Sequence, residues 1–388
     1  MFQHAPLQGS NAERSRHRNR QAVLEQIHRQ GTMGRAEIAR ALSLSTQAVS
    51  NIIADLSGDG LLIERGHLNV GRGQPARQYA LNPKGGFALG IEVRPDAVLS
   101  ALLNMQGQAV VTKRVALQKT DRGTIVDTVK KLFHHALADV PNARHRMLGA
   151  GIVMPGPFGT TGIAGHGTGL EDWCDVDLTT LFSDALGLPV EVSNDANAAA
   201  MAERLSGAAQ DLSTYAYLYF GAGLGLGIVS GGHLVQGAFG NAGEIGHIPV
   251  LGGYDNLESA LSRSSVQRHL QRVGKKGGDI EALGELFTNE DNDLYDWLNQ
   301  ATEALAYAVT IVENIFDPET VILGGAMPDQ ILNHFVAHTP LPAQSVSNRP
   351  NPKLPRLQRG TSGRMTATLG AAALVLHRTL SPQIAHAH

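Results

Sequence analysis

The stretch Tyr215-Ala216-Tyr217-Leu218-Tyr219-Phe220-Gly221-Ala222-Gly223-Leu224-Gly225-Leu226-Gly227-Ile228-Val229-Ser230 decides the fold class of this chain. Residues 215–220 and 225–230 are short apolar runs, and the glycines between them predict a turn that joins two buried strands. Further apolar runs lie at residues 87–93, 97–104, 148–153, 190–192 and 320–323, and residues 196–205 have helical spacing. Strands that alternate with helices predict an α/β fold.

Length and composition bound the organisation of the chain. It has 388 residues, of which 43% are hydrophobic and 17% charged. That composition supports packed cores and excludes a disordered chain, and the length predicts two or three domains. The part after residue 82 is long enough for two lobes, and a cleft between lobes is the expected ligand site.

Cysteine content and hydropathy indicate the compartment. Cys174 is the single cysteine, which excludes an intramolecular disulfide and a multi-cysteine metal site and is typical of a reducing cytosol. No apolar stretch is long enough for a transmembrane helix, and residues 1–10 lack the apolar centre of a signal peptide. We expect a soluble, cytoplasmic protein without a membrane partner.

The charge is unevenly distributed along the chain. Residues 1–82 hold 10 Lys+Arg against 6 Asp+Glu, a net of +4, whereas the remaining residues hold 22 against 29, a net of −7. A basic N-terminal part on an acidic body suggests a module that binds a polyanion, although an ordinary solvated surface has the same composition.

The basic part contains a helix-turn-helix pattern. Apolar residues recur at helical spacing in residues 22–28, 35–42 and 46–56, with Ser45 as the N-cap of the third helix. The third helix directs short, uncharged hydrogen-bonding side chains outward, and Gln and Asn can pair with adenine in the major groove. The expected base-reading residues are Thr46, Gln47, Ser50 and Asn51. The alternative is an ordinary three-helix unit with a polar outer face.

Two strands after these helices favour DNA binding. Residues 61–64 and 77–81 predict an antiparallel pair, and the segment between them is too polar and glycine-rich for a core. This pattern is a winged helix-turn-helix, in which Arg72 and Arg77 suit phosphate or minor-groove contacts. We therefore predict a DNA-binding domain over residues 1–82 that includes a basic N-terminal arm. The arm contains Arg14, Arg16, Arg18 and Arg20.

The body carries a series of motifs in a set order. They are Pro155-Gly156-Pro157, Trp173, Ser193-Asn194-Asp195-Ala196-Asn197-Ala198-Ala199-Ala200, residues 221–227, Gly243-Glu244-Ile245-Gly246-His247 and Leu323-Gly324-Gly325. Each motif alone is weak. Together with the winged helix in front, the ordered set resembles the ROK family (repressors, ORFs and kinases) over about residues 18–377.

The resemblance implies a two-lobed, actin-like fold of the sugar-kinase type that binds sugar between its lobes. It divides residues 83–388 into a first lobe of about residues 83–195 with a C-terminal helix at 366–388, and a second lobe of about residues 196–365. Asp195 matches the general base of the family's kinases, and a carboxylate there can equally accept a sugar hydroxyl. The alternative is that Asp195 only stabilises the N-terminus of the helix starting near Ala196.

The resemblance also implies the other ligand residues. Asn194, Glu244 and Glu258 match the sugar-contacting positions, and His247 matches a zinc ligand of the family. No cysteine lies between His247 and Glu258, and one histidine cannot supply a tetrahedral site, so we expect no zinc. His247 then either contacts the sugar or has a structural role.

A second departure concerns ATP. Family kinases begin the body with an Asp-x-Gly-Gly-Thr turn whose backbone amides approach phosphates, and the matching stretch here is Gly90-Ile91-Glu92-Val93-Arg94-Pro95-Asp96-Ala97. Both glycines and the threonine of the family's turn are absent from this stretch. Pro95 lacks an amide donor, and Asp96 adds negative charge. We expect no ATP and no other cofactor, with Asp195 a vestigial base and no catalytic residue. The glycines at 221–227 persist, but they suit a fold requirement equally well.

The residues and the resemblance together favour a sugar-responsive transcriptional regulator. We expect a repressor of carbohydrate uptake or catabolism genes that binds a palindromic double-stranded DNA operator as a homodimer or homotetramer. The alternative is an ATP-dependent sugar kinase that carries a DNA-binding domain. A regulator that responds to a non-sugar ligand or a protein partner is a third possibility, because the altered zinc segment can reshape the site.

Overall fold

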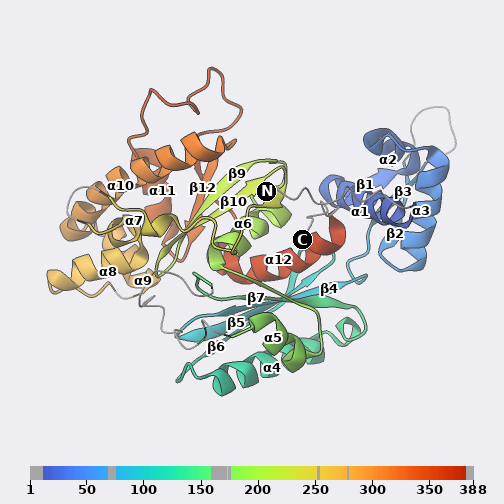
Figure 1. The fold of residues 1–388 in the computed structure, drawn as a ribbon, viewed down its shortest axis with the longest axis horizontal. Helices are drawn as coiled ribbons and strands as arrows, with labels where there is room; N and C mark the ends of the chain where they lie inside the picture. The colour runs from blue at the N-terminus through green and yellow to red at the C-terminus, as the bar shows by residue number, and fades with distance from the viewer. Residues whose placement is uncertain are drawn as a thin grey trace, which may run out of the picture.

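The N-terminal part combines three helices with a small antiparallel sheet of strand order β1-β3-β2. The structure, a computed structural model, describes residues 12–68, 76–158, 173, 176–250, 254–277 and 279–381. The N-terminal elements are α1 (Ala12–Gln30), β1 (Thr32–Gly34), α2 (Arg35–Leu42), α3 (Thr46–Gly58), β2 (Leu62–Leu68) and β3 (Ala76–Leu81). They stand beside two larger lobes (Figure 1). The predicted helix-turn-helix and its two wing strands are confirmed, whereas β1 was not expected.

The turn between α2 and α3 follows from local chemistry. Ser43 ends α2 in the left-handed region with φ of 54°. Ser45 then caps α3, as predicted, because its hydroxyl oxygen accepts a hydrogen bond from the Ala48 N–H at 3.2 Å. The inward face of α3 is fully apolar and consists of Val49, Ile52, Ile53 and Leu56. This packing leaves the opposite, polar face of α3 outside the core.

The prediction of a basic N-terminal arm is wrong, because the arginines assigned to it lie in α1. Neither glycine nor proline interrupts residues 12–30, so the helix begins at residue 12 instead of residue 22. Arg16 forms an ion pair with Asp55, and Arg20 forms one with Asp59. These pairs hold α1 against the C-terminal end of α3.

Each lobe contains a five-stranded sheet. The first has the order β6-β5-β4-β7-β8 and the second β11-β10-β9-β12-β13. The strands are β4 (Phe87–Val93), β5 (Ala97–Asn104), β6 (Ala109–Ala116), β7 (Met147–Val153), β8 (Val190–Ser193), β9 (Tyr215–Phe220), β10 (Leu224–Ser230), β11 (His233–Leu234), β12 (Val321–Gly325) and β13 (Leu357–Arg359). In each sheet, antiparallel hairpins adjoin parallel strands. The predicted α/β class is confirmed.

Helices cover both faces of each sheet (Figure 1). The outer covers are α4 (Arg122–Asp139) and α5 (Leu178–Leu186) on the first sheet, and α7 (Leu257–Leu261), α8 (Arg263–Arg272), α9 (Ile280–Thr288), α10 (Asn292–Phe316) and α11 (Asp329–His338) in the second lobe. Two helices, α6 (Asp195–Ser206) and α12 (Thr366–Leu380), lie between the sheets. No helix within the described ranges is long and apolar enough to cross a membrane.

The two central helices approach each other closely because small residues line their contact. A Cβ atom added to Gly370 of α12 would lie 1.8 Å from the carbonyl oxygen of Ala198 in α6. One added to Gly151 of β7 would lie 1.9 Å from the carbonyl oxygen of Ala371. Backbones this close leave no room for a side chain, so α6, α12 and the first sheet form one tightly packed block.

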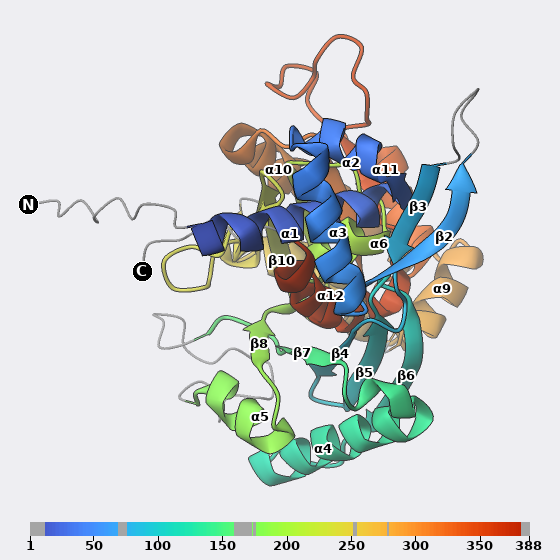
Figure 2. The same ribbon diagram turned by 90° about the vertical axis from the view of Figure 1, so that its right-hand side faces the viewer.

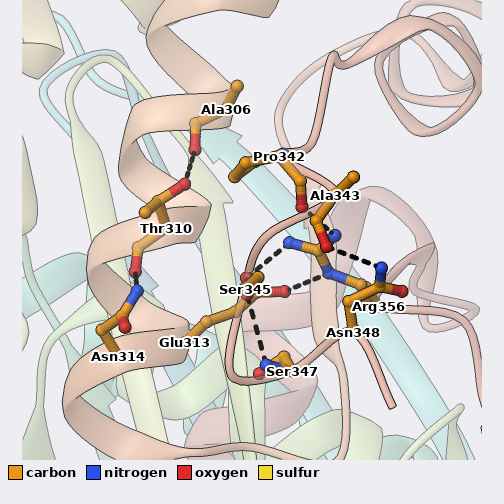
Figure 3. Close-up of polar contacts among 10 residues, drawn as sticks. All are labelled: Ala306, Thr310, Glu313, Asn314, Pro342, Ala343, Ser345, Ser347, Asn348 and Arg356. Carbon is orange, nitrogen blue, oxygen red and sulfur yellow. Dashed lines mark hydrogen bonds and ion pairs between the residues drawn. The ribbon is translucent and has the colours of Figure 1, made fainter. Parts of the chain in front are cut away.

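A buried ion pair fixes the long segment between α11 and β13 (Figure 3). Glu313 of α10 is 1% exposed and accepts two hydrogen bonds from the guanidinium of Arg356, both at 2.7 Å. The Ser345 hydroxyl donates a third at 2.7 Å, and a further Arg356 N–H donates to the carbonyl oxygen of Pro342 at 2.8 Å. One carboxylate therefore ties α10 to Ser345 within the segment and to Arg356 at its end.

Candidate ligand site and DNA-contacting surface

A cavity of about 330 Å³ lies between the two sheets, where β4, β7 and β8 end and β9 turns into β10. β4, β7 and β8 are parallel, so the residues that follow them meet at one edge of the first sheet. All five predicted ligand residues line this cavity: Asn194, Asp195, Glu244, His247 and Glu258. Their binding of a sugar stays a prediction.

Asn194 and Asp195 have different roles at the start of α6. Asn194 is the N-cap, because its side-chain oxygen accepts a hydrogen bond from the Asn197 N–H at 2.8 Å. Asp195 accepts one hydrogen bond through Oδ1 from the adjacent Ala196 N–H at 2.9 Å. Its Oδ2 lies beside Gly221, where an added Cβ would be 3.4 Å away. Asn194 thus caps the helix, and Asp195 keeps an oxygen that faces the cavity.

The protonation of Asp195 depends on its surroundings. Burial raises the pKa of its carboxyl group to about 7, and the negative charges of Glu92 and Glu244 act in the same direction. The hydrogen bond from Ala196 and the positive charge of Arg94 oppose the shift. Near neutral pH the carboxyl group can therefore either donate or accept a hydrogen bond, which suits contact with hydroxyl groups.

The opposite wall of the cavity comes from the second lobe. Glu244 precedes a short 3-10 helix (Ile245–His247), and its Oε2 is 3.7 Å from Nε2 of His247. Glu258 of α7 accepts a hydrogen bond from the Leu224 N–H at 3.1 Å. Burial raises the pKa of Glu244, His247 opposes this shift, and Glu258 reinforces it. Several carboxylates in the lining of one cavity suit a ligand with several hydroxyl donors.

The glycine-rich turn is partly a packing requirement. A Cβ on Gly223 would lie 2.2 Å from Oε2 of Glu258, and one on Gly225 would lie 2.8 Å from Cβ of Ala196. These glycines let the β9–β10 hairpin approach the start of α6 and the Glu258 carboxylate. The structural interpretation therefore accounts for these positions without a nucleotide.

No group of three or more His, Cys, Asp and Glu side chains within the described ranges is arranged to hold a metal ion. Cys174 lies outside the described residues. The absence of zinc stays a prediction from the sequence of residues 247–258.

The turn between β4 and β5 contributes an arginine to the cavity that sequence reasoning missed. Asp96 of this turn forms an ion pair with Arg114 of β6 at 2.9 Å, and Arg94 forms one with Glu92 at 2.6 Å. Arg94 faces the cavity, with its Nε donating to Glu92, and Arg263 at the start of α8 lines the same cavity. Arg94 lies in the stretch at residues 90–97 that departs from the family's pattern, so the sequence could have indicated it. Arg263 belongs to no motif, and only the tertiary fold brings it here.

The predicted base-reading residues lie on the outer face of α3. Thr46, Gln47 and Asn51 are exposed and Ser50 is half-buried. The Gln47 side-chain amide donates a hydrogen bond to Oδ1 of Asn51 at 3.1 Å, so the two amides orient each other. On the wing, Arg77 is exposed and forms an ion pair with Glu64 at 3.3 Å. Arg72 lies outside the described residues. DNA contact by these side chains stays a prediction.

The two lobes match a known protein family. The model of the ROK family covers residues 88–378, which comprise nearly all of these lobes. This chain belongs to the ROK family. The sequence-based assignment to this family, with its actin-like fold, is therefore confirmed.

The relatives of this ROK protein include regulators and kinases. The xylose repressor of Bacillus spizizenii is 24% identical over 373 residues, which cover 93% of this chain and 96% of the repressor. The glucokinase of Halalkalibacterium halodurans is 26% identical and covers 74% of this chain and 92% of the kinase. A ROK family transcriptional regulator described as a homologue of E. coli Mlc superposes with a TM-score of 0.72 at 21% identity, over 95% of this chain and 98% of the regulator. The alignments with the two regulators thus extend into the N-terminal module.

Proposed function

We propose that this ROK protein is a sugar-responsive transcriptional repressor whose N-terminal module binds operator DNA. The observation that carries the proposal is the packing of the winged-helix module on the ends of α6, which begins in the ligand cavity, and α12, which contacts the cavity residue Glu92. The full-length similarity to a xylose repressor supports it. A palindromic operator and a homodimer or homotetramer belong to the same proposal, since paired half-sites need paired recognition helices.

Helix α6 connects the cavity with the DNA-binding module. It begins at Asp195 in the cavity and is about 18 Å long at 1.5 Å per residue. Near its other end, Arg204 forms an ion pair with Glu25 of α1 at 3.3 Å. The ring of His28 in α1 forms a hydrogen bond with the carbonyl oxygen of Leu205 at 3.3 Å. A shift of α6 at the ligand therefore reaches α1 without an intervening loop.

Helix α12 provides a parallel connection. Near its start, the Thr368 hydroxyl donates to Glu92 at 2.5 Å, and Glu92 lines the cavity. Near its end, the carbonyl oxygen of Arg378 accepts a hydrogen bond from the side chain of Gln21 in α1 at 3.0 Å. Figure 2 shows α1 lying across α6 and α12. Residues of α1, α3, α6 and α12 also share one hydrophobic cluster.

These contacts give a physical route for regulation. A sugar that binds one arrangement of the two lobes better than another shifts the population of that arrangement. Because α1 is attached to both central helices, each arrangement places the recognition helix differently. A difference in sugar affinity of about 1–3 kcal/mol between the two arrangements suffices for a 5- to 150-fold change in DNA affinity.

The proposal is tested by a DNA-binding assay on the full chain. Fragments from upstream of the protein's own gene are titrated with purified protein, with and without a panel of pentoses, hexoses and N-acetylhexosamines. We expect specific binding to at least one fragment and its weakening by one sugar or sugar derivative. The proposal fails if no fragment is preferred over random DNA, or if no compound of this kind changes the affinity.

Replacement of Asn51 by alanine is expected to reduce sequence discrimination more than overall DNA affinity. The exposed amide is placed by its hydrogen bond from Gln47, and one good base contact contributes about 1–3 kcal/mol of discrimination. The ratio of operator to random-DNA affinity should fall roughly 5- to 100-fold in filter-binding titrations. Equal weakening on both DNAs would show that Asn51 does not read bases.

A double variant of α1, Gln21→Ala with Glu25→Ala, is expected to weaken the effector response while preserving operator binding. It removes the hydrogen bond to Arg378 and the ion pair with Arg204. The effector-induced change in operator affinity should fall at least roughly threefold, within the range of measured coupling energies. Glu13→Ala on the same helix, where Glu13 is exposed, is the matched control and should respond like wild type. An unchanged response in the double variant would exclude this junction from the coupling.

One observation favours a second function, that of an ATP-dependent sugar kinase. Asp195 combines a pKa of about 7 with a place in the cavity, which suits a general base, and a glucokinase is among the relatives. The loss of the glycine turn at residues 90–97 argues against it. The test is an assay of ATP-dependent phosphorylation of hexoses and N-acetylhexosamines. Activity that Asp195→Asn abolishes would show that the protein is a kinase and would contradict our inference that it is not an enzyme.

A further inference from the structure

The lining of the cavity contains arginines as well as carboxylates. Arg94 follows β4, Arg263 begins α8, and Arg268 lies exposed at the rim. A neutral sugar needs the carboxylate acceptors but offers no charge to the guanidinium groups. The arginines are therefore not explained by sugar recognition alone.

Two of these guanidinium groups have buried N–H donors without an acceptor. They are Nη2 of Arg94 and Nε of Arg263, and neither has a hydrogen-bond partner among the described residues. Buried donors are nearly always paired in folded proteins, and an unpaired donor on a charged group is costly. Both atoms belong to residues that line the same cavity, where a bound anion would supply acceptors to the two side chains.

Nearby carboxylates do not fill this role. Glu92 is occupied by the Thr368 hydroxyl at 2.5 Å and by Nε of Arg94 at 2.6 Å. Asp96 forms its ion pair with Arg114 at 2.9 Å. Within the described part of the chain, Arg263 has no ion-pair partner.

The two arginines also repel each other. Burial lowers the pKa of Arg263, and the positive charge of Arg94 lowers it further, with partial relief from Tyr219 and Asp96. Like charges held close in a partly buried site are stabilised by a bound anion between them. The repulsion between Arg94 and Arg263 and their unpaired N–H donors thus both favour binding of an anion.

The backbone amides of this region are already used. The N–H groups of Arg263 and Ser264 donate to the carbonyl oxygens of Gly221 and Ala222 at 3.3 and 3.4 Å. The N-terminus of α8 is therefore closed by the glycine-rich turn. Anion recognition here falls to the arginine side chains, whose planar N–H groups match phosphate and carboxylate oxygens.

We propose that the effector is an anionic sugar derivative, with its hydroxyl groups at Asp195, Glu244 and Glu258 and its phosphate or carboxylate group bound by Arg94 and Arg263. This inference rests on the proposed function and names the chemical class of the effector. A cavity of about 330 Å³ lies at the lower end of the usual range for small-ligand sites, so it suits a single sugar unit with one charged group.

The inference is tested by calorimetric titration of the full-length protein with matched ligands. Each set contains a neutral sugar, its terminal phosphate and its uronic acid, for glucose, N-acetylglucosamine and xylose. ATP and inorganic phosphate form separate arms. We expect a charged member of one set to bind at least about 10-fold more tightly than its neutral parent, as charged hydrogen bonds imply. The phosphate and uronic acid arms show which anionic group is preferred.

Substitution of Arg263 tests whether the preference for a charged ligand depends on this side chain. Arg263→Gln should abolish the advantage of the charged ligand, and Arg263→Lys should retain part of it. Arg272→Gln is the matched control, because Arg272 is an exposed arginine of the same helix outside the cavity. Retained operator binding by each variant shows that it is folded.

The possible outcomes separate this inference from the proposed function. Operator release by a neutral sugar that binds as tightly as its charged derivatives would overturn the anionic effector and leave the regulator intact. Charge-dependent binding that Arg263→Gln leaves unchanged would also overturn it. Arg263-dependent binding of ATP without any binding of charged sugars would assign the arginines to a nucleotide and reject our proposal. Failure of the regulator itself would appear as the absence of specific DNA binding.

Discussion

Replacing Arg356 with methionine is expected to lower the free energy of unfolding by about 3–5 kcal/mol. The guanidinium supplies two of the three hydrogen bonds that the Glu313 carboxylate receives, and Glu313 is 1% exposed. Methionine leaves that charge buried with the Ser345 hydroxyl as its remaining partner (Figure 3). Urea unfolding followed by tryptophan fluorescence, to which Trp297 buried in the same helix contributes, measures the loss.

Two further variants show whether a buried charge causes the loss. Arg349→Met removes an ion pair with Asp317. The side chains of Arg349 and Asp317 are 49% and 65% exposed, so this change should lower the free energy of unfolding by less than about 1 kcal/mol. Adding Glu313→Leu to Arg356→Met removes the unpaired carboxylate and should recover much of the stability. Comparable losses for Arg349→Met and Arg356→Met, or no recovery in the double variant, would contradict this explanation.

The regular elements with strong local signals were predictable from the sequence. Strands β4, β5 and β9 and helix α2 coincide with their predicted ranges, because each is a short apolar or amphipathic run with a turn residue at its boundary. Helix α1 was predicted too short, since its first turns have no apolar periodicity. Those turns are stabilised by helix propensity and by ion pairs with Asp55 of α3 and with Asp59 at the C-cap of that helix.

The acidic half of the site was predictable, whereas the basic half was not. Asp195, Glu244 and Glu258 lie in or next to motifs that keep their order along the chain, and the fold brings them to one cavity. Arg263 is isolated in the sequence and reaches the cavity because the turn at Gly221 packs on the start of α8. The burial of Glu313 was equally hidden, since its partner Arg356 lies 43 residues further along the chain.

Replacing Asp195 with asparagine is expected to stabilise the ligand-free protein at pH 8 by about 2–4 kcal/mol. Its folded-state pKa of about 7 exceeds the ordinary value of 3.8, so the folded state binds the proton more tightly than the unfolded chain does. The associated stability is complete below about pH 4 and is lost as the pH rises towards 7. Asparagine has a similar shape and no charge to bury beside Glu92 and Glu244. The gain should therefore disappear near pH 4.

The same substitution is expected to impair the effector response. Asparagine can still accept the Ala196 N–H, which preserves the start of α6, but its amide cannot accept hydroxyl hydrogen bonds as a carboxylate does. Effector affinity should fall about 10- to 100-fold, the loss associated with a hydrogen bond to a charged group. Thermal melting across pH 4 to 8 and operator release measure the two effects separately. A variant less stable than wild type at pH 8 would show that the carboxylate is not a source of strain. A normal effector response in a stabilised variant would show that Asp195 does not bind the ligand. Higher stability together with a weaker effector response would mean that this protein keeps a destabilising charge because the ligand needs it.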